Sequence, residues 1–205
     1  IERLDAAGLV PKPRMSVAAI HRNITDLLSG FTPRLSRKLL KNQNGLRERV
    51  GVNVAEMATF GGVLPIQGYW QAVFQFAEDE VIILETDIPE TVQYWNLQTN
   101  DEIFNAVDFV CHQSSLNGHQ ARLDTDGRFR AVLSVTDPCV PNWLDSGGSL
   151  EGTLIGRWYA ASTHPLPVLK RVPLSDLRAH LPNETPKVSP EERQSILRTR
   201  RIASQ

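Results

Sequence analysis

The fold is decided by the stretch Tyr69-Trp-Gln-Ala-Val-Phe-Gln-Phe76, followed by the short acidic turn Ala77-Glu-Asp-Glu80 and the run Val81-Ile-Ile-Leu-Glu-Thr86. Aromatic and β-branched residues fit the pleated surface of a sheet, and a short turn between two such runs is typical of a hairpin. The stretch therefore predicts two adjoining β-strands. We expect them to belong to one antiparallel β domain that extends from Trp70 to Trp158 and is organised around the loop Asp137–Gly148.

Further strands are expected along the chain. The turn Asp124-Thr-Asp-Gly127 suits a tight reversal, and the runs 118–123 and 129–135 flank it as a hairpin. Other strands are predicted over 92–98, where Trp95 and Leu97 share one face, and over 152–159 and 168–172. A parallel sheet would need a crossover helix between strands, and few helices intervene. The sequence therefore predicts a mainly β fold, an antiparallel β-sandwich or jelly-roll-like domain over residues 51–173.

Helical segments are predicted on both sides of this domain. In the linker and helical segment 1–50, apolar residues recur every three or four positions from Val17 to Leu28, Gly30 ends the first helix, and a second runs from Thr32-Pro33 to Asn44-Gly45. In the C-terminal helical extension 174–205, a short helix is expected over 175–181. Ser189-Pro-Glu-Glu192 then reads as a capping box that opens a helix through about Arg201.

The composition excludes several classes of partner. Lys and Arg total 22 against 23 for Asp and Glu, so the basic surface that nucleic acid requires is not expected. The longest apolar runs are far shorter than the ~18 to 20 residues of a membrane-spanning helix. The only cysteines, Cys111 and Cys139, form no Cys-x-x-Cys pair and are expected to be buried free thiols. The chain begins at Ile1 without a secretion signal, and we expect a cytoplasmic location.

Familiar catalytic motifs are absent from the sequence. It contains no G-x-G-x-x-G, no Walker A loop, no H-E-x-x-H and no G-x-S-x-G. These absences disfavour a standard dinucleotide enzyme, a nucleotide hydrolase, a zincin and an α/β-hydrolase. We predict no cofactor.

The first candidate site is the loop Asp137–Gly148. Its prolines make the chain rigid and its glycines let the backbone turn, so that Asn142 and Asp145 could present fixed polar groups to a ligand beside Trp143. The structural alternative is that Trp143 plugs one end of the sandwich, while Asn142 and Asp145 hydrogen-bond the loop's own backbone.

The second candidate is the segment Asp108–His119. A turn near Asn117-Gly118 could bring His112 and His119 onto adjoining strands, where two imidazoles and Asp108 would resemble the ligands of a divalent metal. The spacing matches no strong metal signature, so no metal site is predicted. A catalytic or ligand-orienting role for either histidine and an ordinary structural role both stay open.

Arg157 and the aromatic residues in the strands are the third candidate. An inward-facing arginine needs an anionic partner, and a salt bridge to a carboxylate such as Asp145 is favoured over a ligand. Trp95 could stack on a ligand, although strand aromatics are more often core residues. Asp137, Asp145 and Glu151 could also include an acid/base pair of the glycosidase kind.

Several segments resemble the bacterial domain-of-unknown-function 1214 family. They are Tyr94–Gln98, His112–Asn117, Asp126–Phe129, Asp137–Asp145, Glu151–Thr153 and Arg157-Trp158, and the opening Ile1–Gly8 is similar to a segment midway along longer members. The resemblance covers nearly the whole chain. It implies a C-terminal half whose partner is another, largely β, N-terminal half. The family is largely uncharacterised, with members beside genes of lipid, steroid or aromatic catabolism, and it assigns no catalytic residue.

The favoured hypothesis is a soluble, oligomeric β-sandwich that binds or converts a small apolar, aromatic or lipid-like molecule. Asp145, His112 and His119 are the expected catalytic residues, and Asn142, Trp143, Arg157 and Trp95 the expected ligand-binding residues. The alternatives are a carbohydrate-binding or structural assembly module, and a metal-assisted hydrolase that uses His112, His119 and an aspartate. The expected partners are a small-molecule ligand, the N-terminal half and further copies of the chain.

Overall fold

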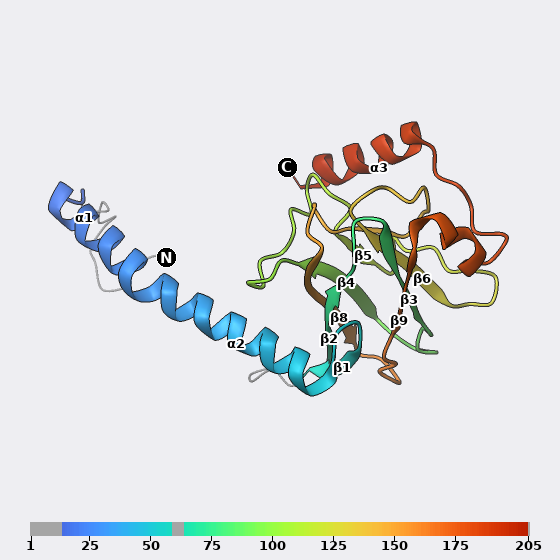
Figure 1. Ribbon diagram of the computed structural model, residues 1–205, viewed down its shortest axis with the longest axis horizontal. Coiled ribbons are helices and arrows are strands. Elements are labelled where there is room, and N and C mark those ends of the chain that lie inside the picture. The colour runs from blue at the N-terminus through green and yellow to red at the C-terminus, as the bar shows by residue number, and fades with distance from the viewer. Residues whose placement is uncertain (1–13, 59–63, 205) are drawn as a thin grey trace, which may run out of the picture. The chain divides into compact units, whose positions relative to one another are not determined.

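The computed structural model describes residues 14–58 and 64–204, so the segment Ile1–Gly8 lies outside the described residues. The chain divides into two compact units, the first ending at Leu39 and the second beginning at Leu40. The described residues of the first unit are almost all helical. The second contains two β-sheets and the C-terminal helix (Figure 1).

The helical segment is continuous where two breaks were predicted. Helix α1 (Val17–Asp26) begins at the N-cap Ser16, passes through a π-helical turn (Leu27–Phe31) and leads into α2 (Thr32–Val50). The prediction that Gly30 ends a helix is wrong, because the wider π turn takes up Gly30 without breaking the helix. The predicted end at Asn44-Gly45 is also wrong. A helical glycine costs about 1 kcal/mol, whereas burying Leu46, which is 1% exposed, contributes about 1.5 to 3 kcal/mol.

In the described part of the chain, nine strands form two sheets, and the predicted mainly β fold is confirmed. The five-stranded sheet has the order β1 (Ala55–Ala58), β2 (Gln67–Gln75), β8 (Glu151–Tyr159), β4 (Tyr94–Asn100) and β5 (Ser115–Asn117). The four-stranded sheet has the order β7 (Trp143–Asp145), β6 (Phe129–Ser134), β3 (Glu80–Thr86) and β9 (Val168–Pro173). Neighbouring strands are antiparallel except β6 and β7, which are parallel.

The predicted hairpin over 69–86 is wrong in its pairing. Its strands exist, but β2 pairs with β1 and β8, and β3 pairs with β6 and β9 in the other sheet. The turn at Ala77–Glu80 therefore carries the chain from one sheet to the other. Local sequence does not separate these outcomes, because β2 and β3 are both largely buried, as expected of central strands.

The turn at Asp124–Gly127 is confirmed, but the strand predicted over 118–123 is not. Gly127 has φ +79°, and its N–H donates to the Asp124 carbonyl at 2.9 Å. Of the residues 118–123, only Leu123 forms a β-bridge to the following strand, opposite Phe129. The strand that precedes the turn is β5, which ends at Asn117. Asn117 explains the difference, because its side-chain oxygen accepts hydrogen bonds from the N–H groups of His119 and Gln120 and turns the chain out of the sheet.

The main core lies between the two sheets. The alternation predicted for β4 is confirmed, with Trp95 and Leu97 buried in this core. The Trp95 ring lies 4.9 Å from that of Phe129 and 5.9 Å from that of Trp158, between ring centroids. A second apolar layer packs on the other face of the four-stranded sheet, beneath the 3-10 helix η2 (Leu174–His180). Apolar contacts on both faces of β3 explain its unbroken run Val81–Leu84.

Helix α3 (Pro190–Ala203) closes the chain, and its predicted capping box is confirmed. The Ser189 hydroxyl accepts from the Glu192 N–H at 3.2 Å, and the Glu192 carboxylate accepts from the Ser189 N–H at 2.7 Å. Both cysteines are free, but they are exposed rather than buried as expected. Within residues 14–58 and 64–204, no helix has the length and apolar character needed to cross a membrane.

We predict that Gly156→Ala destabilises the sandwich by about 1 to 3 kcal/mol, because small-to-large changes overpack a core. A Cβ atom at Gly156 would lie 2.0 Å from Cε2 of Trp70. Urea denaturation followed by tryptophan fluorescence measures the change. Gly45→Ala is the matched control, since no atom lies within 4 Å of its added Cβ, and we expect it to be neutral or stabilising by up to about 1 kcal/mol. Equal stability of the two variants would contradict the packing role of Gly156.

Candidate functional site

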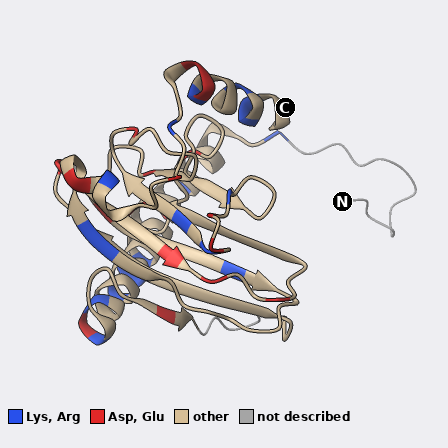
Figure 2. Ribbon diagram, turned by 90° about the vertical axis from the view of Figure 1, so that its right-hand side faces the viewer, with Lys and Arg blue, Asp and Glu red and all other residues tan. Residues whose placement is uncertain are grey.

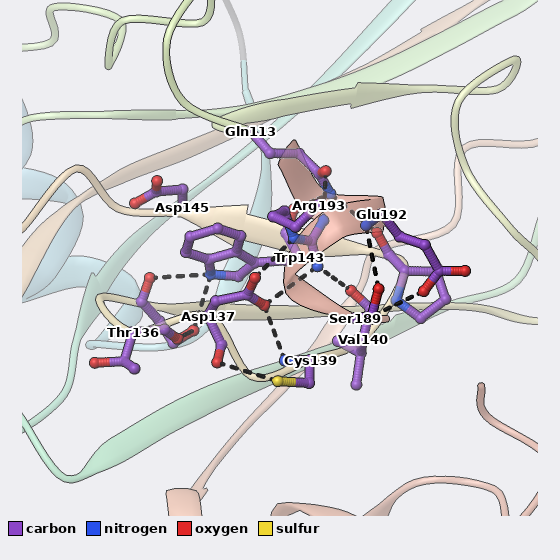
Figure 3. Close-up of polar contacts among 12 residues, drawn as sticks. Gln113, Thr136, Asp137, Cys139, Val140, Trp143, Asp145, Ser189, Glu192 and Arg193 are labelled. Carbon is purple, nitrogen blue, oxygen red and sulfur yellow. Dashed lines mark hydrogen bonds and ion pairs between the residues drawn. The ribbon is translucent and has the colours of Figure 1, made fainter. Parts of the chain in front are cut away.

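The buried side chain of Arg193 holds helix α3 against the loop Asp137–Gly148. The guanidinium donates to Asp137 Oδ2 at 2.8 Å and Oδ1 at 3.2 Å, to Gln113 Oε1 at 2.6 Å and to the Val140 carbonyl at 2.5 Å. It also lies 5.0 Å from the centre of the Trp143 ring. Figure 3 shows the guanidinium enclosed by these groups. Arg193 therefore joins three segments that are distant in the sequence.

The side chains of Asn142 and Trp143 bind the loop to neighbouring segments of the chain. Asn142 accepts from the Arg122 N–H at 2.9 Å and donates to the carbonyls of Arg122 and Arg130 at 2.6 and 2.8 Å. The Trp143 indole N–H donates to the Ser134 hydroxyl at 3.0 Å. The partners of Asn142 and Trp143 therefore lie outside the loop, whereas the structural alternative had Asn142 bonding the loop's own backbone. The ligand-binding roles of Asn142 and Trp143 stay predictions.

Asp145 and His112, two of the three expected catalytic residues, lie side by side in the structure. His112 Nδ1 lies 2.7 Å from Asp145 Oδ2, and Asp145 Oδ1 accepts from the Gly147 N–H at 2.8 Å. The Asp145 side chain is 11% exposed, whereas that of His112 is 42% exposed. A carboxylate at Nδ1 orients an imidazole and leaves Nε2 available to take or give a proton. The pair therefore has the arrangement that general acid/base chemistry uses.

Among the residues that the structure describes, Arg157 has no carboxylate partner of the kind that the sequence favoured. Its guanidinium carbon lies 4.8 Å from the centre of the Tyr69 ring on the neighbouring strand, and Asp145 is paired with His112 instead. The reason is strand alternation: Trp158 points into the core, so Arg157 points to the opposite face of the five-stranded sheet. Trp95 lies in the core with Phe129 and Trp158. The ligand-binding roles of Arg157 and Trp95 stay predictions.

The three carboxylates among which an acid/base pair was considered each have a different partner. Asp137 binds Arg193, Asp145 pairs with His112, and Glu151 binds Arg47 at 2.9 Å. Among the described residues, no group of three or more His, Cys, Asp and Glu side chains could hold a metal ion. The described residues therefore supply no set of metal ligands for the alternative of a metal-assisted hydrolase.

His119 lies in a wide groove beside α3, which we call the α3 groove. Its volume is about 630 Å³. The lining comes from α3, from the segment that includes β5 and its following turn, and from two proline-containing loops. The residues are Gln113, Leu116, His119, Gln120, Arg122, Pro141, Pro186, Lys187, Val188, Glu192, Ser195, Ile196, Thr199 and Arg200.

The charge of the groove is mainly positive. Arg122, Lys187 and Arg200 line it together with His119, whereas Glu192 is the single acid and is already engaged in the capping box. Arg200 donates to the Ser115 carbonyl at 2.6 Å, and burial lowers the pKa of its guanidinium. Within residues 14–58 and 64–204, the side chains of His119, Arg122 and Lys187 make no hydrogen bond or ion pair. Elsewhere on the strands and α3, acidic and basic residues are interspersed (Figure 2).

The sequence did not indicate most of this groove. Of the predicted site residues, only His119 lines it. Arg122 and Lys187 stand in unrelated segments, and Arg200 lies in the last turn of α3, where a basic residue complements the helix dipole without any ligand. The capping box did locate α3, but no sequence signal shows which surface the helix covers. The six other predicted residues lie in the loop, the His112–Asp145 pair, the core or the face of the five-stranded sheet.

Comparison with known proteins shows a shared fold without a named activity. No family model matches the chain, and no curated protein matches it. The chain is similar to the crystal structure of an uncharacterised protein from Burkholderia cenocepacia, with 26% identity over 67% of this chain and a TM-score of 0.62. That match spans only 39% of the Burkholderia chain. A second similar structure is the VPA0106 protein from Vibrio parahaemolyticus, with 17% identity, 55% and 32% of the two chains covered, and a TM-score of 0.44.

We predict that Arg193→Ala lowers the free energy of unfolding by about 3 kcal/mol or more, because it leaves Asp137 and Gln113 without their buried partner. Urea denaturation measures the loss. The matched control is Arg198→Ala on the same helix, an exposed position that should change stability by no more than about 0.5 kcal/mol. A similar small effect for both variants would contradict the role of Arg193.

Proposed function

We propose that the α3 groove binds a small organic anion with an apolar body, such as a fatty or aromatic carboxylate. The observation that carries the proposal is the combination of an apolar floor with three basic or imidazole side chains, His119, Arg122 and Lys187, that have no partner among the described residues. The proposal assigns the anionic group of the ligand to these side chains.

The size and lining of the groove support this class of ligand. Ligand sites commonly have volumes of ~300 to 1,000 Å³ and pair apolar walls with a few placed polar groups, and the groove measures about 630 Å³. Leu116, Pro141, Val188 and Ile196 offer apolar contact surface. Burying apolar surface is worth about 25 cal/mol per Å², so the body of the ligand would supply most of the affinity.

The basic side chains would supply selectivity rather than most of the affinity. Arg122, Lys187 and His119 are exposed, and exposed ion pairs contribute only about 0 to 1 kcal/mol each. Several such groups around one carboxylate still favour an anion over a neutral molecule with the same body. The partly buried Arg200 adds a positive charge that is screened less by water.

The wider identity of the chain is a further proposal. We propose membership in the domain-of-unknown-function 1214 family, together with a second half of the protein and a role in the catabolism of apolar molecules. The segments quoted from the sequence support the membership. The match covers 39% of the Burkholderia chain, so that chain extends well beyond the matched region.

Calorimetric titration with decanoate and with 1-decanol tests the binding proposal. We expect decanoate to bind more tightly than 1-decanol, because only decanoate carries the negative charge. The double change Arg122→Ala and Lys187→Ala should weaken decanoate binding about tenfold, which corresponds to about 1.4 kcal/mol, and leave 1-decanol binding unchanged. Ile196→Asp should weaken the binding of both molecules, because it places a charge on the apolar floor.

Arg198→Ala serves as the control, because Arg198 is exposed on α3 outside the groove lining and its loss should not change decanoate affinity. Decanoate binding of equal strength to wild type and to the double variant would refute the proposed site. Absence of decanoate binding to the wild-type chain would refute the ligand class.

A further inference from the structure

The outer face of the five-stranded sheet gathers all three tyrosines of the chain around one arginine. The strands β2, β8 and β4 lie side by side in that order (Figure 1), and the residues that alternate with the core residues point to this face. Arg157 stands in the middle strand, opposite Tyr69 on one side and Asn96 on the other. Tyr159, two residues further along β8, is opposite Tyr94. These side chains therefore form one patch, which we call the tyrosine face.

The guanidinium of Arg157 has no acceptor in the described part of the chain. It lies over the Tyr69 ring, and its Nε atom is buried without a hydrogen bond. Glu56 and Glu151, which lie on the same face of the sheet, are already bound to arginines of α2. Because a partly buried cation is costly without an acceptor, the position favours an anionic group from a ligand.

A hollow of about 220 Å³ opens in the same face, one strand away from Arg157. The sheet supplies Asn96, Gln98 and Ser115 to its lining, and the loop after β4 supplies Phe109, which is 55% exposed. Among the described residues the amide of Asn96 makes no hydrogen bond, and that of Gln98 only donates one, at 2.8 Å. The hollow therefore offers unused amide groups beside an aromatic wall.

We propose that the tyrosine face binds an acidic sugar, with its carboxylate on Arg157 and its hydroxyls on the amides of Asn96 and Gln98. Sugar hydroxyls both donate and accept, which suits side-chain amides that do the same. The C–H faces of a sugar ring pack on aromatic rings, and Tyr94 and Phe109 present such rings at 42% and 55% exposure. The planar fork of an arginine matches a carboxylate with two parallel hydrogen bonds.

The composition of the face argues against other occupants. Protein interfaces have an apolar centre, whereas amide and hydroxyl side chains of the strands form the floor of this hollow. Nucleic acid needs several free cations, whereas Arg47 and Arg49 of α2 are already paired with Glu151 and Glu56. An acidic sugar matches both the unpaired charge and the unused amides. The hollow shares no lining residue with the α3 groove, so this proposal is independent of the anion proposed there.

Calorimetric titration of the 205-residue chain with trigalacturonate, and with the neutral galactose trimer of the same linkage, tests the proposal. We expect trigalacturonate to bind about tenfold more tightly, because a charged hydrogen bond to Arg157 adds to the hydroxyl contacts. Arg157→Met, which keeps the length of the side chain and removes its charge, should abolish this preference. Tyr94→Ala should weaken the binding of both trimers, and the exposure of Tyr94 leaves the core intact in this variant.

Arg171→Met is the matched control, because Arg171 is exposed on β9 of the other sheet and its loss should change neither affinity. The double change Arg122→Ala and Lys187→Ala separates the two sites, since it should weaken decanoate binding and leave trigalacturonate binding unchanged. Near-ultraviolet circular dichroism verifies that each variant is folded, because the tryptophans lie in the second unit.

Four results would overturn the proposal. They are absence of trigalacturonate binding to the wild-type chain, equal wild-type affinity for the two trimers, an unchanged preference in folded Arg157→Met, and unchanged affinities in Tyr94→Ala. Loss of trigalacturonate binding in the double variant would place the sugar in the α3 groove instead, and would equally refute the tyrosine face as its site.

Discussion

The guanidinium of Arg193 is buried where α3, the segment around Gln113 and the loop Asp137–Gly148 meet. A buried cation is costly unless its donors are satisfied, and here a carboxylate, an amide and a backbone carbonyl accept from it. The same contacts fix where α3 lies on the sandwich. The position of the C-terminal helix thus depends on one charge and its acceptors.

The docking of α3 creates the α3 groove. The helix forms one wall of the α3 groove through Glu192, Ile196 and Arg200, and the opposite wall comes from the segment that Arg193 and Arg200 bind. His112, which directly precedes Gln113, is held by Asp145 of the loop Asp137–Gly148. Asp145 of the loop orients His112, and Asn142 and Trp143 bind the loop to neighbouring segments.

The sequence predicted the fold class, the alternation of β4, the turn at Asp124–Gly127 and the capping box of α3, because each depends on local preferences and periodicity. The sequence did not predict which strands pair with one another. Whether β2 pairs with β3 depends on which sheet each strand enters, and both strands have similar apolar runs. The continuation of the helix through Gly30 and Gly45 depends on a π turn and on the burial of Leu46. The groove joins His119, Arg122 and Lys187 only through tertiary packing.

The central claim is that α3, anchored by Arg193, forms a groove that receives an apolar organic anion. A crystal structure of the chain with decanoate tests it most directly. We expect the carboxylate among His119, Arg122 and Lys187, with the alkyl chain against Leu116 and Ile196. Decanoate bound at another surface, with the groove empty in the same crystal, would contradict it.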